Sequence, residues 1–182
     1  MYMEYIIALS LLVAMGAWVV GAYLRLFHLY ERVQGAWQQW SLATEQRNEC
    51  LRDFTDAIAD YLPAGDVLPQ DMNRWEEDSR RALQASPTAP REGNFTCIAR
   101  AERLLRRAVN YSVRTLENTQ LMRENEQLLS LCSAVSVSLY QQDAQMRLYN
   151  RSASEYNTAL HSPGAKIVAG IFGFTPVAAG EC

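Results

Sequence analysis

An unbroken pattern of alternating four- and three-residue steps between residues 26 and 61 restricts this part of the chain to a helical fold. Its positions are Leu26, Tyr30, Val33, Trp37, Trp40, Thr44, Arg47, Leu51, Phe54, Ile58 and Tyr61, and nine of the eleven are apolar or aromatic. A period of 3.5 residues sustained over this length forms the contact stripe of a left-handed bundle or coiled coil. No proline occurs between residues 5 and 62, so we expect one continuous helix there.

The same helix is expected to begin in a membrane. Residues 5–24 form a run of twenty residues without a charge, and as a helix such a run is about 30 Å long, the thickness of a hydrocarbon core. The run is too long for the apolar region of a signal peptide, and Glu4 stands before it where such a peptide carries a basic group. A buried core helix is the alternative interpretation.

Basic residues flank the apolar run on one side only. Arg25 and Arg32 follow it, and no lysine or arginine precedes it. The positive-inside rule therefore places the N-terminus outside and the rest of the chain in the cytoplasm, as a single-pass protein. The four cysteines show no metal-ligand spacing, and they suit a reducing compartment.

Three further helices are expected, over about residues 70–85, 96–117 and 121–160. Proline-rich and polar turns separate them, and the loop at residues 86–95 is a candidate for disorder. The first and last helices of the soluble part are long, and short loops favour up-down packing of neighbouring helices.

The expected fold is therefore all-α. An N-terminal transmembrane helix, residues 1–25, continues into an antiparallel, up-down four-helix bundle, residues 26–161, and an apolar C-terminal tail follows, residues 162–182. Because the last helix would return to the membrane, we expect Ile171, Phe172 and Phe174 of the tail near the bilayer. The tail is too short to span, and it either lies at the interface or plugs the base of the bundle.

Polar residues on the expected contact stripes have two interpretations each. Arg47 either is buried, and then needs a partner such as Glu124 or Glu126 of the last helix, or reaches out to the edge of the bundle. Asn150 and Asn157 lie one heptad apart. They form either an inward polar ladder that fixes helix register or part of a functional groove.

Several motifs resemble those of the LemA family. They are the run Asn125–Leu131 (NEQLLSL), the pairs Tyr149-Asn150 and Tyr156-Asn157, and Pro163 followed by Ala169-Gly170-Ile171-Phe172-Gly173-Phe174. Residues 26–62 and 121–174 carry the resemblance, although the family's proline in the first helix is absent. The resemblance implies an N-terminally anchored helical bundle in the bacterial cytoplasmic membrane. It implies no enzyme activity.

Candidate chemistry is sparse. The chain has no nucleophile elbow, no phosphate-binding loop and no dinucleotide fingerprint, so we expect neither catalysis nor a cofactor. His28 and His161, the two histidines, are expected at the membrane-proximal end. A metal site there would need further ligands such as Glu31 or Glu155, and surface histidines are the ordinary alternative.

Four arginines on the third expected helix are the strongest interaction candidate. Arg100, Arg103, Arg106 and Arg107 fall on one face. They would meet an acidic protein partner or anionic lipid headgroups, unless they form only a solvated surface.

These features favour a non-enzymatic, single-pass membrane protein whose bundle is a structural or interaction scaffold at the bacterial inner membrane. The expected partners are membrane lipid and other membrane or cytoplasmic proteins; with a net charge of −3, nucleic acid is not expected. One alternative is a homo-oligomeric membrane assembly, supported by Gly16 and Gly21 in the membrane helix. Others are an envelope-associated signalling or adaptor protein and a metal-binding protein at the end that carries His28 and His161.

Overall fold

The computed structural model of the chain describes residues 2–59, 61, 66–117 and 125–180. All of its regular structure there is α-helical, which confirms the predicted class. The helices are α1 (Tyr2–Ala59), α2 (Leu68–Gln84), α3 (Glu92–Glu117), α5 (Glu126–Leu160) and α6 (Pro163–Phe172).

α1 is one continuous helix of 58 residues, about 87 Å long at 1.5 Å per residue. The predicted continuity from the apolar run into the contact stripe is confirmed. Along the stripe, nine of the eleven predicted positions are buried, and Tyr30 and Tyr61 are half-buried. The four- and three-residue steps therefore mark the side of α1 that packs.

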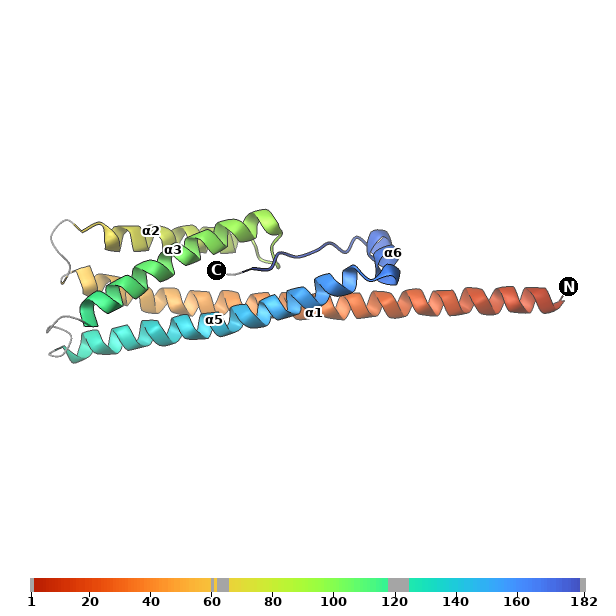
Figure 1. Cartoon of the computed structure of the whole chain (residues 1–182), viewed down its shortest axis with the longest axis horizontal. Helices are drawn as coiled ribbons and strands as arrows, with labels where there is room; N and C mark the ends of the chain where they lie inside the picture. Colours follow the sequence, from red (N-terminus) through yellow and green to blue (C-terminus); the bar gives the residue numbers. More distant parts are fainter. Residues whose placement is uncertain (1, 60, 62–65, 118–124, 181–182) are drawn as a thin grey trace.

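α5 runs back along α1, and these two helices form the long axis of the molecule (Figure 1). The buried side chains of α5 repeat the same steps: Leu128, Cys132, Val135, Leu139, Gln142, Met146, Tyr149, Ala153, Tyr156 and Leu160. Asn125 caps its first turn, because its side-chain oxygen accepts a hydrogen bond from the Leu128 amide at 3.1 Å. The earlier start expected at residue 121 lies outside the described residues.

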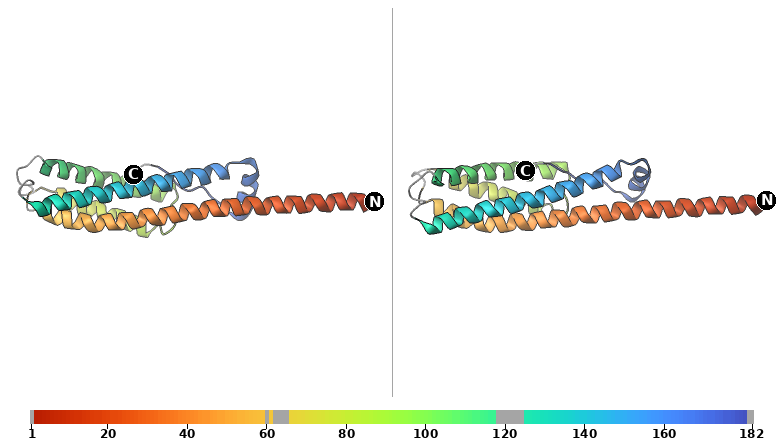
Figure 2. Two further views of the ribbon diagram at one scale, coloured as in Figure 1. Left: turned by 90° about the horizontal axis from the view of Figure 1, so that it is seen from below. Right: turned by 60° about the horizontal axis from the view of Figure 1, so that its bottom comes forward.

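α2 and α3 pack on each other, and α2 also contacts α1. Both lie beside the half of α1 that is far from the N-terminus, as Figures 1 and 2 show. α2 begins two residues earlier than predicted and α3 four residues earlier. The early start of α2 has a simple reason, since Pro69 lies in its first turn, where a missing amide hydrogen costs nothing.

The loop between α2 and α3, proposed from the sequence as a disorder candidate, makes defined contacts in the structure. Trp37 Nε1 donates a hydrogen bond to the Ser86 carbonyl at 3.0 Å, and the Ala89 amide donates to Gln34 Oε1 at 2.9 Å. Residues 92–95 belong to α3. Both contacts tie the loop to α1.

The core consists of two apolar clusters. One surrounds Trp37, Trp40, Tyr149 and Tyr156 on the side toward the N-terminus. The other is distal and includes Phe54, Ile58, Met72, Leu105, Val109 and Val135. The stripe of α1 passes from the first cluster to the second through Thr44 and Arg47, and that of α5 through Gln142. A layer of polar side chains therefore separates the two clusters.

The N-terminal part of α1 extends beyond the other helices (Figure 1). Residues 2–18 are all exposed, and among the described residues α1 is the one helix long and apolar enough to cross a membrane. The short apolar helix α6 packs against α1 just after this stretch. The chain then turns at Gly173, which has a left-handed φ of 75° that glycine adopts readily.

Candidate functional site

A buried polar layer joins the four longer helices. Arg47 and Thr44 come from α1, Ser79 from α2, Glu102 from α3 and Gln142 from α5, and each is at most 1% exposed. The layer lies where each helix stripe carries a polar residue at a position otherwise held by an apolar one. Four separate chain segments are thus aligned at one level of the molecule.

Every donor of the Arg47 guanidinium has an acceptor. Nη1 and Nη2 form a two-point ion pair with the Glu102 carboxylate, in which Nη2 lies 3.0 Å from Oε1. Nη1 also donates to Gln142 Oε1 at 3.3 Å, and Nε and Nη2 donate to Asn48 Oδ1 at 3.1 and 2.6 Å. A guanidinium has five N–H groups, and these five hydrogen bonds engage all of them.

The Glu102 carboxylate is equally saturated. Besides the two hydrogen bonds from Arg47, it accepts one from the Ser79 hydroxyl and one from the Gln142 amide at 2.7 Å. The same amide of Gln142 donates to Thr44 Oγ1 at 3.0 Å. Since no buried atom of Arg47, Thr44, Ser79, Glu102 or Gln142 lacks a hydrogen-bond partner, the chemistry of the layer suits positioning of the helices.

The charges in this layer depend on each other. Burial by itself raises the pKa of Glu102, but the positive charge of Arg47 and the hydrogen bonds from Arg47, Ser79 and Gln142 lower it more. The net result is a pKa below the ordinary value, so Glu102 is ionised at neutral pH. Removal of either ion-pair partner would leave an uncompensated charge in the interior.

The sequence placed Arg47 on the stripe but suggested the wrong partner. Glu126 is exposed and Glu124 lies outside the described residues, whereas Glu102 of α3 makes the pair. Glu102 was missed, although it carries a signal. Ile98, Glu102, Leu105 and Val109 continue the four- and three-residue steps, as do Leu139, Gln142 and Met146 on α5. Each of these helices has a polar residue at a stripe position, and the charges of Arg47 and Glu102 are opposite. This combination is the feature that would have revealed the layer.

Asn150 and Asn157 bind the chain's own C-terminal segment rather than another helix. Asn157 donates to the Val177 carbonyl at 2.8 Å and accepts from the Val177 amide at 3.1 Å. Asn150 makes the same two contacts with Gly180, at 2.8 and 3.0 Å. Of the two interpretations from the sequence, the polar ladder between helices is not what the structure has: the asparagines face a groove that residues 174–180 occupy.

The tyrosines of the two Tyr-Asn pairs add to this groove. The Tyr156 hydroxyl donates to the Thr175 carbonyl at 3.0 Å, and the Tyr149 hydroxyl donates to the Ala178 carbonyl at 2.5 Å. From the opposite side, the Pro90 carbonyl accepts from the Ala178 amide at 3.0 Å. Burial, and to a lesser degree the neighbouring Tyr30, raises the pKa of Tyr156 to about 12, so its hydroxyl remains a donor over the physiological range.

The C-terminal tail divides into two parts with different positions. α6 lies against the first turns of α1 that follow the exposed apolar stretch, and Tyr23 contacts Phe172 and Phe174 with ring centroids 4.7 and 5.7 Å away. Ile171 and Phe172 are exposed, whereas Phe174 is half-buried. Residues 174–180 instead run away from the N-terminal end, back along α5 (Figure 1). Of the described tail, α6 and the residues up to Phe174 therefore lie at the end of the molecule from which the start of α1 extends.

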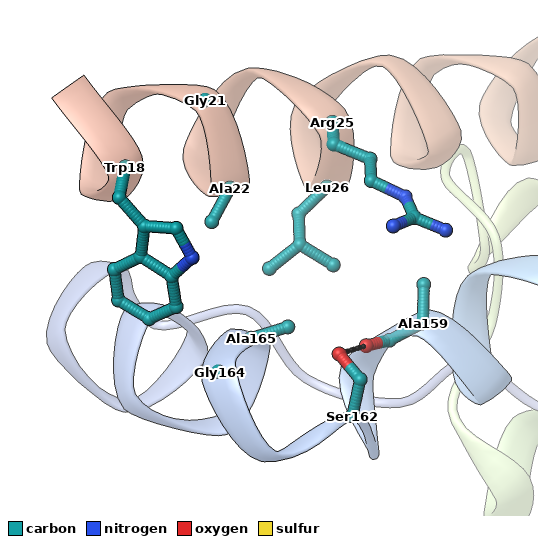
Figure 3. A pocket seen from close by; sticks show the side chains of 9 residues that line it. All are labelled: Trp18, Gly21, Ala22, Arg25, Leu26, Ala159, Ser162, Gly164 and Ala165. Carbon is teal, nitrogen blue, oxygen red and sulfur yellow. Dashed lines mark hydrogen bonds between the residues drawn. The ribbon is translucent and has the colours of Figure 1, made fainter.

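A cleft of about 440 Å³ opens between α1 and α6. In Figure 3, Trp18, Ala22 and Leu26 of α1 point toward the first turn of α6, and the Arg25 guanidinium lies at one edge. A side chain on Gly164 would meet the Trp18 ring, since a Cβ there would lie 2.4 Å from Cζ2. The glycine thus permits the close contact between these helices.

The two histidines do not form a metal centre with the glutamates suggested from the sequence. His28 lies 3.5 Å from Glu31 on its own helix, and Glu155 pairs with Arg32 at 3.2 Å. His161 ends α5, with Nδ1 2.6 Å from the Asn157 carbonyl. Across the part of the chain that the structure describes, no three His, Cys, Asp or Glu side chains gather closely enough to hold a metal ion.

The arginine face of α3 is smaller than the spacing suggested. Arg106 is bound to Asp143 of α5 through a two-point ion pair, and so it joins two helices. Arg100, Arg103 and Arg107 remain exposed. The face available to a partner therefore consists of three arginines.

These features give one buried polar layer, one groove that the chain's own residues 174–180 occupy, and two exposed surfaces, the apolar start of α1 and the three arginines of α3. No protein-family model matches the chain, and no curated protein matches it either.

Proposed function

We propose that the protein is a non-enzymatic, single-pass protein of the bacterial inner membrane and a divergent relative of the LemA family. Its soluble part, an up-down four-helix bundle, acts as a rigid interaction scaffold in the cytoplasm. One observation carries the proposal: residues 2–18, which include most of the apolar run, are exposed on a helix that continues without a break into the packed part of the molecule.

Exposure of the run to water would be costly. Transfer of apolar surface out of water gains roughly 25 cal/mol for each Å², and nearly every side chain between residues 2 and 24 is apolar. Because residues 2–17 are exposed and apart from Glu4 and Ser10 carry no polar side chain but tyrosine, a bilayer is the environment that suits them. Residues 2–17 of α1, which precede the contact with α6, form a helical segment about 24 Å long. This is slightly less than the thickness of a hydrocarbon core.

α6 supports this placement. Val168 and Ala169 are buried against the rest of the molecule, while Ile167, Ile171 and Phe172 are exposed. A short helix with one apolar face outward can enter the headgroup boundary by about 5–10 Å. That depth, added to the length of residues 2–17 of α1, matches the thickness of the hydrocarbon core of a bilayer.

The charges favour a cytoplasmic bundle. Arg25 and Arg32 follow the apolar run, and Lys166 lies on α6 at the same end. Basic residues beside a membrane segment remain predominantly on the cytoplasmic side. The three exposed arginines of α3 would then face cytoplasmic partners with acidic surfaces.

Crosslinking followed by mass spectrometry in native membranes tests the proposal. We expect crosslinks from the bundle to other membrane or cytoplasmic proteins, and their loss in the variant R100A/R103A/R107A. The control R91A/R147A/R151A removes the same charge from exposed arginines elsewhere and should keep the crosslinks. Crosslinks only between copies would instead favour a homo-oligomeric assembly, and loss of crosslinks in both variants would remove the specific role of the α3 face.

A further inference from the structure

The groove along α5 that holds residues 174–180 recognises main chain rather than side chains. Seven hydrogen bonds join this segment to Asn150, Asn157, Tyr149, Tyr156 and Pro90, and all of them use main-chain atoms of the segment. Such contacts would form with almost any extended peptide. Affinity from the backbone and selectivity from a few pockets are typical of peptide-binding sites.

The spacing of the two asparagines fits an extended peptide. Seven residues of helix rise about 10.5 Å, and three residues of extended chain cover about 10 Å. Asn157 and Asn150 are seven residues apart, and the residues that they bind, Val177 and Gly180, are three apart. Each carboxamide thus meets both an amide and a carbonyl of one residue, which requires the segment to be extended.

Two positions of the segment are restricted by their surroundings. The Val177 side chain is buried, at 8% exposure, in the apolar cluster around Trp37 and Tyr149. Gly180 faces the buried ring of Phe95, where an added Cβ would lie 3.2 Å from Cε1. Thr175, Pro176 and Ala179 are exposed. The groove therefore selects a small apolar residue followed three positions later by glycine.

We infer that this groove is a peptide-binding site for an extended segment of a partner protein with the pattern Val-x-x-Gly, and that residues 174–180 occupy it in cis. The segment follows the turn at Gly173, which offers a place to pivot out of the groove. Release of the tail would expose Asn150, Asn157 and the Val177 site to the partner. This inference deepens the proposed scaffold function, because it names the class of partner.

Binding of a labelled peptide to the full-length protein in detergent tests the inference. The probe is a capped fluorescent peptide with the sequence of residues 174–180 (FTPVAAG). V177D places a charge in the buried site and should release the tail, which hydrogen exchange of residues 174–180 would report. We expect V177D to bind the probe at least about tenfold more tightly than the wild type, whose groove is filled.

Matched variants identify the contacts. N150A/N157A/V177D should not bind the probe, whereas Q141A/V177D, altered at an exposed position of α5, should bind as V177D does. Changes in the probe peptide identify its side of the contact, with the V177D protein as the receptor. An aspartate in place of the peptide's valine, or a leucine in place of its glycine, should abolish or strongly weaken binding. A lysine in place of the alanine that corresponds to Ala179 should not.

Three results would overturn the inference. The first is a V177D protein that does not bind the probe although residues 174–180 exchange their amide hydrogens rapidly. The second is a variant N150A/N157A/V177D that binds the probe as tightly as V177D does. The third is a V177D protein in which residues 174–180 stay protected from hydrogen exchange. A wild-type dimer that dissociates when both asparagines are changed would assign the groove to a second copy, and would also refute a separate partner. Because membrane anchoring plays no part in this measurement, its failure would not affect the proposed anchor, which the crosslinking experiment tests.

Discussion

Arg47 of α1 and Glu102 of α3 form an ion pair in the interior, with their side chains 0% and 1% exposed and 55 residues apart in the chain. Their hydrogen bonds to Asn48, Ser79 and Gln142 complete the layer. An arginine surrounded by its acceptors tolerates no shift of one helix by a turn. The layer therefore fixes which residues of the helices lie at the same level, in the way that a buried polar residue fixes register in coiled coils.

The first prediction concerns the energy of this pair. E102L leaves Arg47 charged and unpaired, so we expect a loss of about 3–5 kcal/mol in the free energy of unfolding. The double variant R47M/E102L removes both charges and should recover most of this loss. Denaturant unfolding of the soluble part in the full-length protein measures both.

The control for this prediction is R151M. Arg151 pairs with Glu155 at 3.2 Å, but the two side chains are 77% and 36% exposed, and such pairs contribute at most about 1 kcal/mol. An E102L variant as stable as R151M would show that the layer does not hold the helices.

The second prediction concerns acid. The pKa of Glu102 is lower in the folded protein than its ordinary value of 4.5, so the unfolded chain binds a proton first as pH falls. The stabilisation by ionised Glu102 is then fully present above about pH 4.5 and is lost as pH falls from there toward the folded pKa.

Unfolding of the wild type and E102Q over an acidic pH series measures this effect. The wild type should lose stability more steeply below about pH 4.5 than E102Q does. Parallel curves for the two proteins would contradict the assigned direction of the pKa.

The third prediction concerns the contact of α6 with α1. In G164L the new side chain collides with the Trp18 ring, which already lies within 2.4 Å of a Cβ position there. We expect faster hydrogen exchange over residues 163–172, with unchanged exchange in α2 and α3. The matched change G170L meets no atom within 4 Å and should leave α6 protected, so equal effects of both changes would count against the docking contact.

The fourth prediction concerns alkaline conditions. The pKa of Tyr156 is raised to about 12 by burial, so its neutral hydroxyl contributes stability that is fully present below pH 10 and is lost as pH rises through about 12. The difference in tyrosinate absorbance between wild type and Y156F should therefore titrate near pH 12. Y140F, altered at a side chain that is 70% exposed, serves as the control. A difference that titrates near pH 10 would show that Tyr156 is open to water.

The periodic features of the sequence predicted the fold class and the packed side of α1. Steps of four and three residues identified Leu26, Trp37 and Phe54 as buried, because one face of a helix must pack regardless of its partner. The partner itself is a matter of tertiary arrangement. The four- and three-residue steps mark both Arg47 and Glu102 as facing inward, but the docking of α3 decides that these two residues pair.

The groove was less accessible to prediction. The heptad spacing of Asn150 and Asn157 indicated a repeated contact, but a helix and an extended strand both satisfy a repeat of about 10.5 Å. Residues 174–180 have no periodic pattern of their own, so nothing in the sequence placed them in the groove. The sequence suggested that the tail lies at the membrane interface or plugs the base of the bundle, but it did not indicate that the chain turns back along α5 after Phe174.

Alkaline extraction of native membranes, followed by flotation and intact-mass measurement, tests whether α1 anchors the protein in the bilayer. We expect the full-length protein, with residues 2–24 retained, to stay with the lipid. Extraction of the intact protein into the aqueous phase, or a mass that lacks the N-terminal apolar run, would contradict it.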